Sequence, residues 1–450
     1  GLQGFPNGVY MQVAGAKRVD RGVRRRDQLE RVAGRAATAR SIAEERPLTR
    51  PDEDDPAAAA RRPSELRFVS LPRLERAIAA RQARGQPLDP AMLTLAGLRR
   101  IAYIVVEPES GDLLLAGPAG DWRVERGALV AADTARPLVR LDDLLTLLRR
   151  NHLEGAKAFG CSIVPRQEAL AATQDFLART STAPLPAGGR GEWLRGLRDA
   201  LGEQDVEFYS IEASTRVARL LLAADYHMKL VGMGLAQGVP GVPSYLSTVQ
   251  LGPDGRPPAM TVIRWWFSMP ACQVATTPDR TAYALPEQCV EVLSENELLA
   301  ARGERIHTGI SDDLTGGFAR AFTREFAALA AKYPVYAEME RVFELALALA
   351  VVEREGLLVR SGWTPGLLAD PERLRLPRVT TPRSVETVVN HRTIARRHVI
   401  AGVSGGVWVN PVTQASIVPA PAGEATALAE KATSRMQPDV VGDEQSWWWD

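Results

Sequence analysis

A serine in a glycine-rich stretch is the first residue of this chain that could act as a nucleophile. Ser404 lies in Gly402-Val-Ser-Gly-Gly406, which matches the GxSxG pattern of serine hydrolases. That pattern needs a strand before the serine and a helix after it, but the next residues, Val407-Trp-Val-Asn410, favour a strand. No histidine follows Ser404 to act as its base. The sequence therefore predicts a glycine turn between two strands and no catalytic role for Ser404.

Three polar residues on one predicted helix form a second candidate site. Asp225 and Lys229 are four residues apart beside the apolar stripe of this helix, and His227 falls on its opposite flank. An ion pair at this spacing on a helix surface contributes only about 0.3–0.5 kcal/mol. The alternative is a functional cluster made of Asp225, His227 and Lys229. The sequence leaves both interpretations open.

The remaining histidines and glycines do not form a metal or cofactor site in the sequence. His391 and His398 are seven residues apart in strand-like sequence and would face opposite sides of a sheet. Gly232-Met-Gly-Leu-Ala-Gln-Gly238 follows a predicted helix, so its amides would not lie at a helix N-terminus where phosphate binds. We therefore expect no metal and no cofactor.

The three cysteines are too few and too widely spaced for a zinc site. Cys161 lies in an apolar run and is interpreted as a small buried side chain. Cys272 and Cys289 flank a turn signal at Thr277-Pro-Asp-Arg280, and antiparallel pairing about that turn would bring them nearly opposite each other. In an oxidising compartment they could form a disulfide, and otherwise they are two free thiols.

Tryptophans mark two candidate contact surfaces. In Arg264-Trp-Trp-Phe267, strand alternation places Trp265 and Phe267 on one face and Trp266 on the other. Trp266 is therefore a candidate for an interface, with carbohydrate stacking as the alternative. Trp447, Trp448 and Trp449 end a polar tail and are costly to leave in water, since each can bury roughly 150–250 Å². We expect them to dock in a groove, either on the same chain or, as the preferred alternative, on a neighbouring one.

Composition supports a globular protein of ordinary type. The chain has 450 residues, 45% of them hydrophobic and 24% charged, and a formal net charge of +1. This charge balance gives no reason to expect a nucleic-acid partner. No apolar run is long enough to span a bilayer.

The pattern of helices and strands predicts an α+β protein. We expect a mixed α/β sandwich core with an appended helical hairpin, a C-terminal β-segment and extended arms at both ends. Ser214 is the expected N-cap of the long helix, and strands at 261–269, 272–276, 281–285 and 289–293 are expected to form one antiparallel meander. The predicted divisions are an arm and linker at 1–64, a core at 65–300 (65–155 and 156–300), a helical region at 301–376, a β-segment at 377–420 and a tail at 421–450.

Several short motifs of the chain resemble segments of a known protein family. The main ones are Asp205-Val-Glu-Phe-Tyr-Ser-Ile211, Ala224-Asp-Tyr-His-Met-Lys229, Gly232-Met-Gly-Leu235, Pro243-Ser-Tyr-Leu246, Arg264-Trp-Trp-Phe267, Leu95-Ala-Gly-Leu98 and Val106-Glu-Pro-Glu-Ser-Gly-Asp112. Over roughly residues 70–409 the chain resembles an uncharacterised family of exported bacterial proteins, known mainly from planctomycetes. The resemblance implies export, so we interpret Gly1 as a mature N-terminus after signal cleavage.

Taken together, these patterns favour a non-catalytic protein. We expect an exported structural or assembly protein that associates with itself through its terminal arms, as a subunit of a cell-surface or extracellular assembly. The alternative is an exported hydrolase or ligand-binding enzyme with a site near Asp225, His227 and Lys229. A deep polar pocket at the long helix would favour the enzyme.

Overall fold

The computed structural model describes most of the chain after residue 55. The described residues are 56–125, 128–155, 157–180, 189–251, 253, 262–299, 305–307, 309–394, 397–433 and 447–450. The sequence also predicts a short strand at 8–13 and an arginine-rich helix at 17–46, and both segments lie outside these residues.

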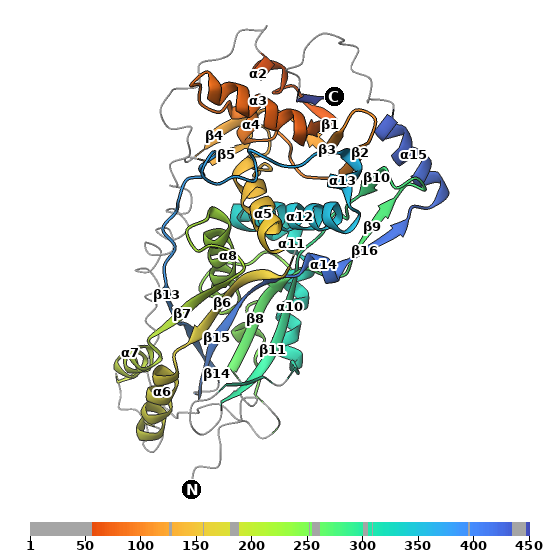
Figure 1. The fold of residues 1–450 in the computed structure, drawn as a ribbon. Coiled ribbons are helices and arrows are strands. Elements are labelled where there is room, and N and C mark those ends of the chain that lie inside the picture. Colours follow the sequence, from red (N-terminus) through yellow and green to blue (C-terminus); the bar gives the residue numbers. More distant parts are fainter. Residues whose placement is uncertain are drawn as a thin grey trace.

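Seven strands form one sheet in the upper part of the molecule (Figure 1). Their order across the sheet is β16-β9-β10-β2-β3-β1-β17, and every neighbouring pair is antiparallel except β16 with β9. The strands are β1 (Ser64–Ser70), β2 (Tyr103–Glu107), β3 (Asp112–Ala119), β9 (Cys272–Thr276), β10 (Ala282–Ala284), β16 (Ala415–Pro419) and β17 (Trp448–Trp449). A separate small hairpin pairs β4 (Trp122–Glu125) with β5 (Ala128–Ala131).

An eight-stranded sheet forms the lower part (Figure 1). Its order is β12-β11-β8-β15-β6-β7-β13, with β14 paired to the first half of β15. The strands are β6 (Phe159–Pro165), β7 (Glu203–Tyr209), β8 (Val262–Ser268), β11 (Glu291–Leu299), β12 (Arg305–His307), β13 (Ser384–Glu386), β14 (Val388–Ile394) and β15 (Arg397–Val409).

Helices fill the space around and between the two sheets. The longer ones are α3 (Leu71–Ala83), α5 (Leu141–Glu154), α6 (Gln167–Thr180), α7 (Arg190–Leu201), α8 (Arg216–Gly232), α10 (Asp313–Arg324), α12 (Pro334–Arg354) and α15 (Ala422–Thr433). The shorter ones are α2 (Pro56–Ala59), α4 (Pro90–Leu93), α9 (Tyr245–Thr248), α11 (Phe326–Lys332), α13 (Leu357–Ser361) and α14 (Pro411–Gln414).

Helices α8 and α12 build the centre of the core. α8 presents its apolar stripe to β6, β8 and β15, and α12 packs against α5, α8 and α11. α12 is apolar on most sides, and its residues from 342 to 352 are all buried. It lies between the two sheets (Figure 1), which explains why the sequence shows no polar face on this helix.

The structure confirms the α+β class and corrects several local expectations. Thr215, rather than Ser214, caps α8, and its side chain accepts a hydrogen bond from the Ala218 amide. The expected C-terminal β-segment is not an appendage, because β15 lies inside the large sheet between β8 and β6. The proposed division into five regions stays a prediction.

The expected glycine turn at 402–406 is also wrong. These residues lie within the continuous strand β15. Gly405 and Gly406 are there because the neighbouring strands come very close: a Cβ on Gly405 would lie 1.7 Å from the Trp265 carbonyl oxygen, and one on Gly406 would lie 2.1 Å from the Cys161 carbonyl oxygen. A sequence pattern cannot separate this need for close approach from a turn.

The expected single meander is instead a long hairpin that passes through both sheets. β8 and β11 pair with each other in the eight-stranded sheet, with Ser268 opposite Glu291. Between them the chain crosses to the seven-stranded sheet, forms the antiparallel pair β9–β10, and crosses back. The two crossings, at 269–271 and 285–290, therefore lie between the sheets.

Candidate functional site

The last four residues of the sequence dock on the edge of the seven-stranded sheet. We call residues 447–450 the tryptophan strand. β17 pairs antiparallel with β1, placing Trp449 opposite Phe68 and Trp448 opposite Val69, and the Ser70 amide donates to the Trp447 carbonyl at 2.9 Å. In Figure 1 this end of the chain lies beside β1. The strand is thus bound by strand addition, a recurrent mode of peptide recognition.

A fully buried arginine anchors the tryptophan strand. Arg67 has no exposed surface, and its guanidinium makes a two-pronged contact with the Asp450 carboxylate through Nε to Oδ1 at 2.7 Å and Nη2 to Oδ2 at 2.8 Å. Its other hydrogen bonds go to the backbone carbonyls of Ala60, Arg62 and Ala96. Among the described residues Asp450 provides the only carboxylate that pairs with Arg67. Such planar two-pronged pairs combine strength with orientation.

The tryptophan rings pack on both faces of β1. Trp447 is 7% exposed and joins the main core. Trp448 lies under the Arg67 guanidinium, 4.4 Å from ring centre to carbon, and Trp449 stacks on Phe68 with ring centres 6.1 Å apart. We call the β1 edge with Arg67 and Phe68 the β1 receptor. In this structure the β1 receptor holds an extended, aromatic segment, and Arg67 pairs with the Asp450 carboxylate.

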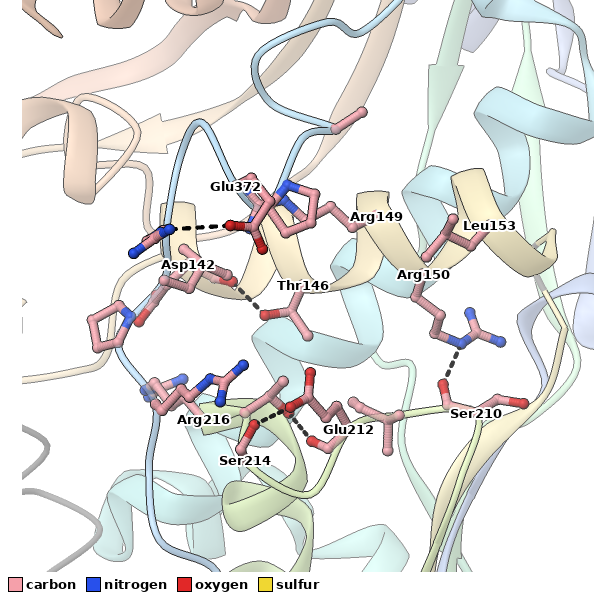
Figure 2. Close-up of a pocket in the computed structure, with 18 of the residues that line it drawn as sticks. Asp142, Thr146, Arg149, Arg150, Leu153, Ser210, Glu212, Ser214, Arg216 and Glu372 are labelled. Atoms are coloured by element: carbon pink, nitrogen blue, oxygen red, sulfur yellow. Dashed lines mark hydrogen bonds and ion pairs between the residues drawn. The ribbon is translucent and has the colours of Figure 1, made fainter.

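A cavity of about 990 Å³ lies between α5, residues 210–216 at the N-terminal end of α8, and residues 369–378 (Figure 2). Five arginines line it: Arg149, Arg150, Arg216, Arg375 and Arg378. Arg149 donates to the Leu374 carbonyl at 2.6 Å, and Arg150 donates to the Ser210 carbonyl at 2.8 Å. Arg216 pairs with Asp143 at 2.5 Å and also with Glu338. These three cations hold the fold together, whereas Arg375 makes an exposed ion pair with Glu372.

Burial and neighbouring charges in this network shift the pKa values of the acidic residues around Arg216. Burial raises the pKa of Asp143 to about 6, although Arg216 opposes this effect. Burial also disfavours the charge on Asp142, but the Arg140 guanidinium at 2.8 Å outweighs it and holds the pKa of Asp142 at about 2. The network joins α5, α8 and α12 and is interpreted as structural.

The residues Asp225, His227 and Lys229 do not meet in a cavity. Asp225 and Lys229 form an ion pair at 2.7 Å with neither side chain exposed, and burial raises the pKa of Asp225 to about 6. His227 points elsewhere: its Nδ1 lies 2.7 Å from the Tyr336 hydroxyl, and burial lowers its pKa to about 4. None of the three lines the cavity of Figure 2. The ion pair is thus part of the core rather than of a helix surface.

Two further candidates lie on the eight-stranded sheet. Ser404 is fully buried within β15. Trp265 and Phe267 are buried on the core face, whereas Trp266 is half-buried on the opposite face beneath Arg264, 4.6 Å from its ring centre. Trp408 is 45% exposed. The alternation expected for Arg264-Trp-Trp-Phe267 is therefore present, and an interface role for Trp266 stays a prediction.

The cysteines are buried and form no disulfide in this structure. Cys272 and Cys289 are both free thiols, and the Cys289 thiol donates to the Pro286 carbonyl at 3.9 Å. Within the part of the chain that the structure describes, no group of three or more His, Cys, Asp or Glu side chains is arranged to hold a metal ion. No helix among the described residues is long and apolar enough to cross a membrane.

Comparison with known proteins places one segment of the chain. Residues 161–245 match the family described as "Protein of unknown function (DUF1598)". The matched segment runs from β6 through α6, α7, β7 and α8 to Tyr245, so it contains the Asp225–Lys229 pair but not the β1 receptor. No curated protein and no solved structure matches the chain significantly.

Sequence reasoning missed the receptor half of this site. Strand β1, Ser64-Glu-Leu-Arg-Phe-Val-Ser70, directly follows a proline-rich linker and carries a central arginine, and no strand was expected at this start of the core. The available signal was its alternation, with Leu66 and Phe68 on one face and Arg67 and Val69 on the other. The carboxylate of Asp450, directly after three tryptophans, was the matching signal on the peptide.

Proposed function

We propose that this protein is an exported, non-catalytic subunit of a cell-surface or extracellular assembly, and that copies are joined through the tryptophan strand. One observation supports this proposal above all: a four-residue strand is bound by a receptor built around the fully buried Arg67. A buried cation is costly unless it is paired, so the fold depends on a carboxylate arriving at this point. That carboxylate belongs to a separate segment of sequence.

The same receptor can take the strand from a second copy. Strand addition uses backbone hydrogen bonds and the Arg67–Asp450 pair, and neither depends on which molecule supplies the strand. Residues 434–446 connect the strand to α15, and a fully extended chain of that length spans on the order of 40 Å. Exchange between two copies makes the same contacts twice, so little is lost when the chain docks in trans.

The enzyme alternative receives less support from the geometry. Asp225 and Lys229 are wholly buried, so a substrate cannot reach them in this conformation. Three of the five arginines that line the large cavity are already bonded to backbone or carboxylate groups of the core. Export itself rests on the family resemblance of the motifs around 205–246.

Sedimentation of the full chain and of a chain lacking residues 446–450 tests the proposal. The full chain should show a mass that rises with concentration, and the truncated chain should stay monomeric over the same range. Trp408→Ala is the matched control, because it removes an exposed tryptophan far in sequence from the β1 receptor and should leave association unchanged. Identical mass distributions for the full and truncated chains would contradict the proposal.

A further inference from the structure

Two cysteines lie at the junction between the two sheets. Cys272 is the first residue of β9, directly after the crossing 269–271, and Cys289 lies in the crossing 285–290, two residues before β11 begins. They therefore mark the two crossings of the long hairpin. Because β8 and β11 pair in one sheet and β9 and β10 pair in the other, the crossings are held side by side from both ends.

The two side chains lie in one buried core. Cys272 and Cys289 are 1% and 0% exposed and belong to the same cluster of packed apolar residues. Continuing the β8–β11 register from Ser268 opposite Glu291 places Cys289 opposite residue 270, two residues before Cys272. The two cysteines therefore lie within two positions of each other across the hairpin, whereas Cys161, the third cysteine, lies on β6 in the other sheet.

We propose that Cys272 and Cys289 form a disulfide that ties together the two chain crossings between the sheets. This inference does not depend on assembly, but it rests on the proposed export, which takes the chain to an oxidising compartment. The oxidant is an external disulfide, either a small one such as oxidised glutathione or that of a thiol–disulfide oxidoreductase. One thiolate attacks this disulfide, forms a mixed disulfide and releases one external thiol. The second cysteine then attacks the mixed disulfide and releases the other, so two electrons pass to the oxidant and both cysteine protons are lost.

The local chemistry distinguishes the roles of the two thiols. The neighbouring Cys289 thiol lowers the pKa of Cys272, whereas the Cys272 thiol, burial and the nearby Glu344 carboxylate raise the pKa of Cys289. Cys272 is therefore the better initial nucleophile and Cys289 the resolving thiol. Since both are buried in the folded chain, the bond forms before the junction closes against α12, that is, while the chain folds.

The bridge would stabilise the junction by restricting the unfolded chain. It closes the loop that contains β9 and β10, and a loop of this length is expected to shift the unfolding equilibrium by roughly a hundredfold. The folded junction in turn protects the disulfide from reductants, because both cysteines are buried once folding is complete.

Counting free thiols tests the inference. The full chain is refolded with reduced and oxidised glutathione, denatured without reductant, alkylated and digested with trypsin. Arg280 lies between the two cysteines, so they fall on separate peptides that stay joined only by a disulfide. We expect one alkylated cysteine, Cys161, and a joined pair containing Cys272 and Cys289. Three alkylated cysteines, or a bridge that involves Cys161, would overturn the proposal.

Stability of the variants provides an independent check. The same loss of stability is expected for Cys272→Ala, for Cys289→Ala and for the double variant, because either change removes the whole bridge. The variant Cys161→Ala should still yield the joined pair of peptides. Additive losses from the two single changes, with no difference between oxidised and reduced wild-type chains, would contradict the bridge. If a variant does not fold, the thiol count on the wild-type chain still decides.

Discussion

Replacing Asp450 by asparagine should release the tryptophan strand. The substitution keeps the size of the side chain but removes the negative charge that faces Arg67, and it places amide hydrogens opposite the hydrogens of the guanidinium. Arg67 would remain fully buried and without its carboxylate partner. The docked state should become much less stable, because an unpaired buried cation is costly.

The expected size of the effect follows from the contacts of the strand. Removing about 400 Å² of tryptophan surface from water contributes roughly 10 kcal/mol. Ordering the strand costs roughly 6 kcal/mol, and closing the segment 434–446 costs roughly 2 kcal/mol. About 2 kcal/mol remains in favour of docking, and the charged hydrogen bonds to Asp450 add roughly 2–3 kcal/mol. Loss of that pair should therefore shift the docking equilibrium by roughly 30–160-fold.

Amide hydrogen exchange of residues 64–70 provides the assay. The Ser70 amide donates to the Trp447 carbonyl, so its protection reports docking directly. Asp450→Asn should accelerate exchange in β1 and shift tryptophan emission to longer wavelength. Glu372→Gln is the control, because it removes an exposed ion pair with Arg375 and should change neither signal. If Asp450→Asn left β1 as protected as in the wild-type chain, the anchoring role of Arg67 would be refuted.

Three further outcomes are expected. Lys229→Met should lower the free energy of unfolding by roughly 3–5 kcal/mol, because it leaves the buried Asp225 carboxylate without its partner. Adding Asp225→Leu should restore most of this loss, and chemical denaturation measures the stability of the single and the double variant. Between pH 6.5 and 4 the wild-type chain should lose up to about 3 kcal/mol more stability than His227→Gln as pH falls, because the His227 pKa is 6.5 unfolded and about 4 folded; equal pH profiles would contradict this. A fluorophosphonate probe should not label Ser404, which is fully buried, and labelling seen by mass spectrometry would contradict the non-catalytic account.

Local patterns predicted much of the fold. The apolar stripe of α8, the hairpin of β2 with β3 and the nearly all-apolar α12 follow from periodicities of 3.6 and 2 within short segments. The turn signal at 277–280 likewise predicted the antiparallel pairing of β9 with β10. Each of these features depends on residues that are close in sequence.

The features that the sequence did not reveal depend on distant pairings. β1 lies between β3 and β17, and its partner strand is separated from it by almost the whole chain. β15 enters the large sheet between β6 and β8, so its glycines reflect neighbours that no local pattern can specify. For the same reason the tryptophans could be predicted to dock, but the buried Arg67 that receives them could not be identified.

Shortening the connection to the tryptophan strand tests the central claim most directly. Near the end of α15, the Lys431 ammonium group donates to the Tyr103 hydroxyl on β2 at 3.0 Å, and β2 lies three strand spacings from β17, or about 14 Å. A chain lacking residues 434–445 keeps one connecting residue, which can span only about 7 Å. Its tryptophan strand therefore cannot reach its own β1 receptor. The account predicts that this variant forms dimers or larger assemblies in sedimentation, and that removing residues 446–450 as well returns it to monomer. A shortened chain that stays monomeric at all concentrations would contradict the account.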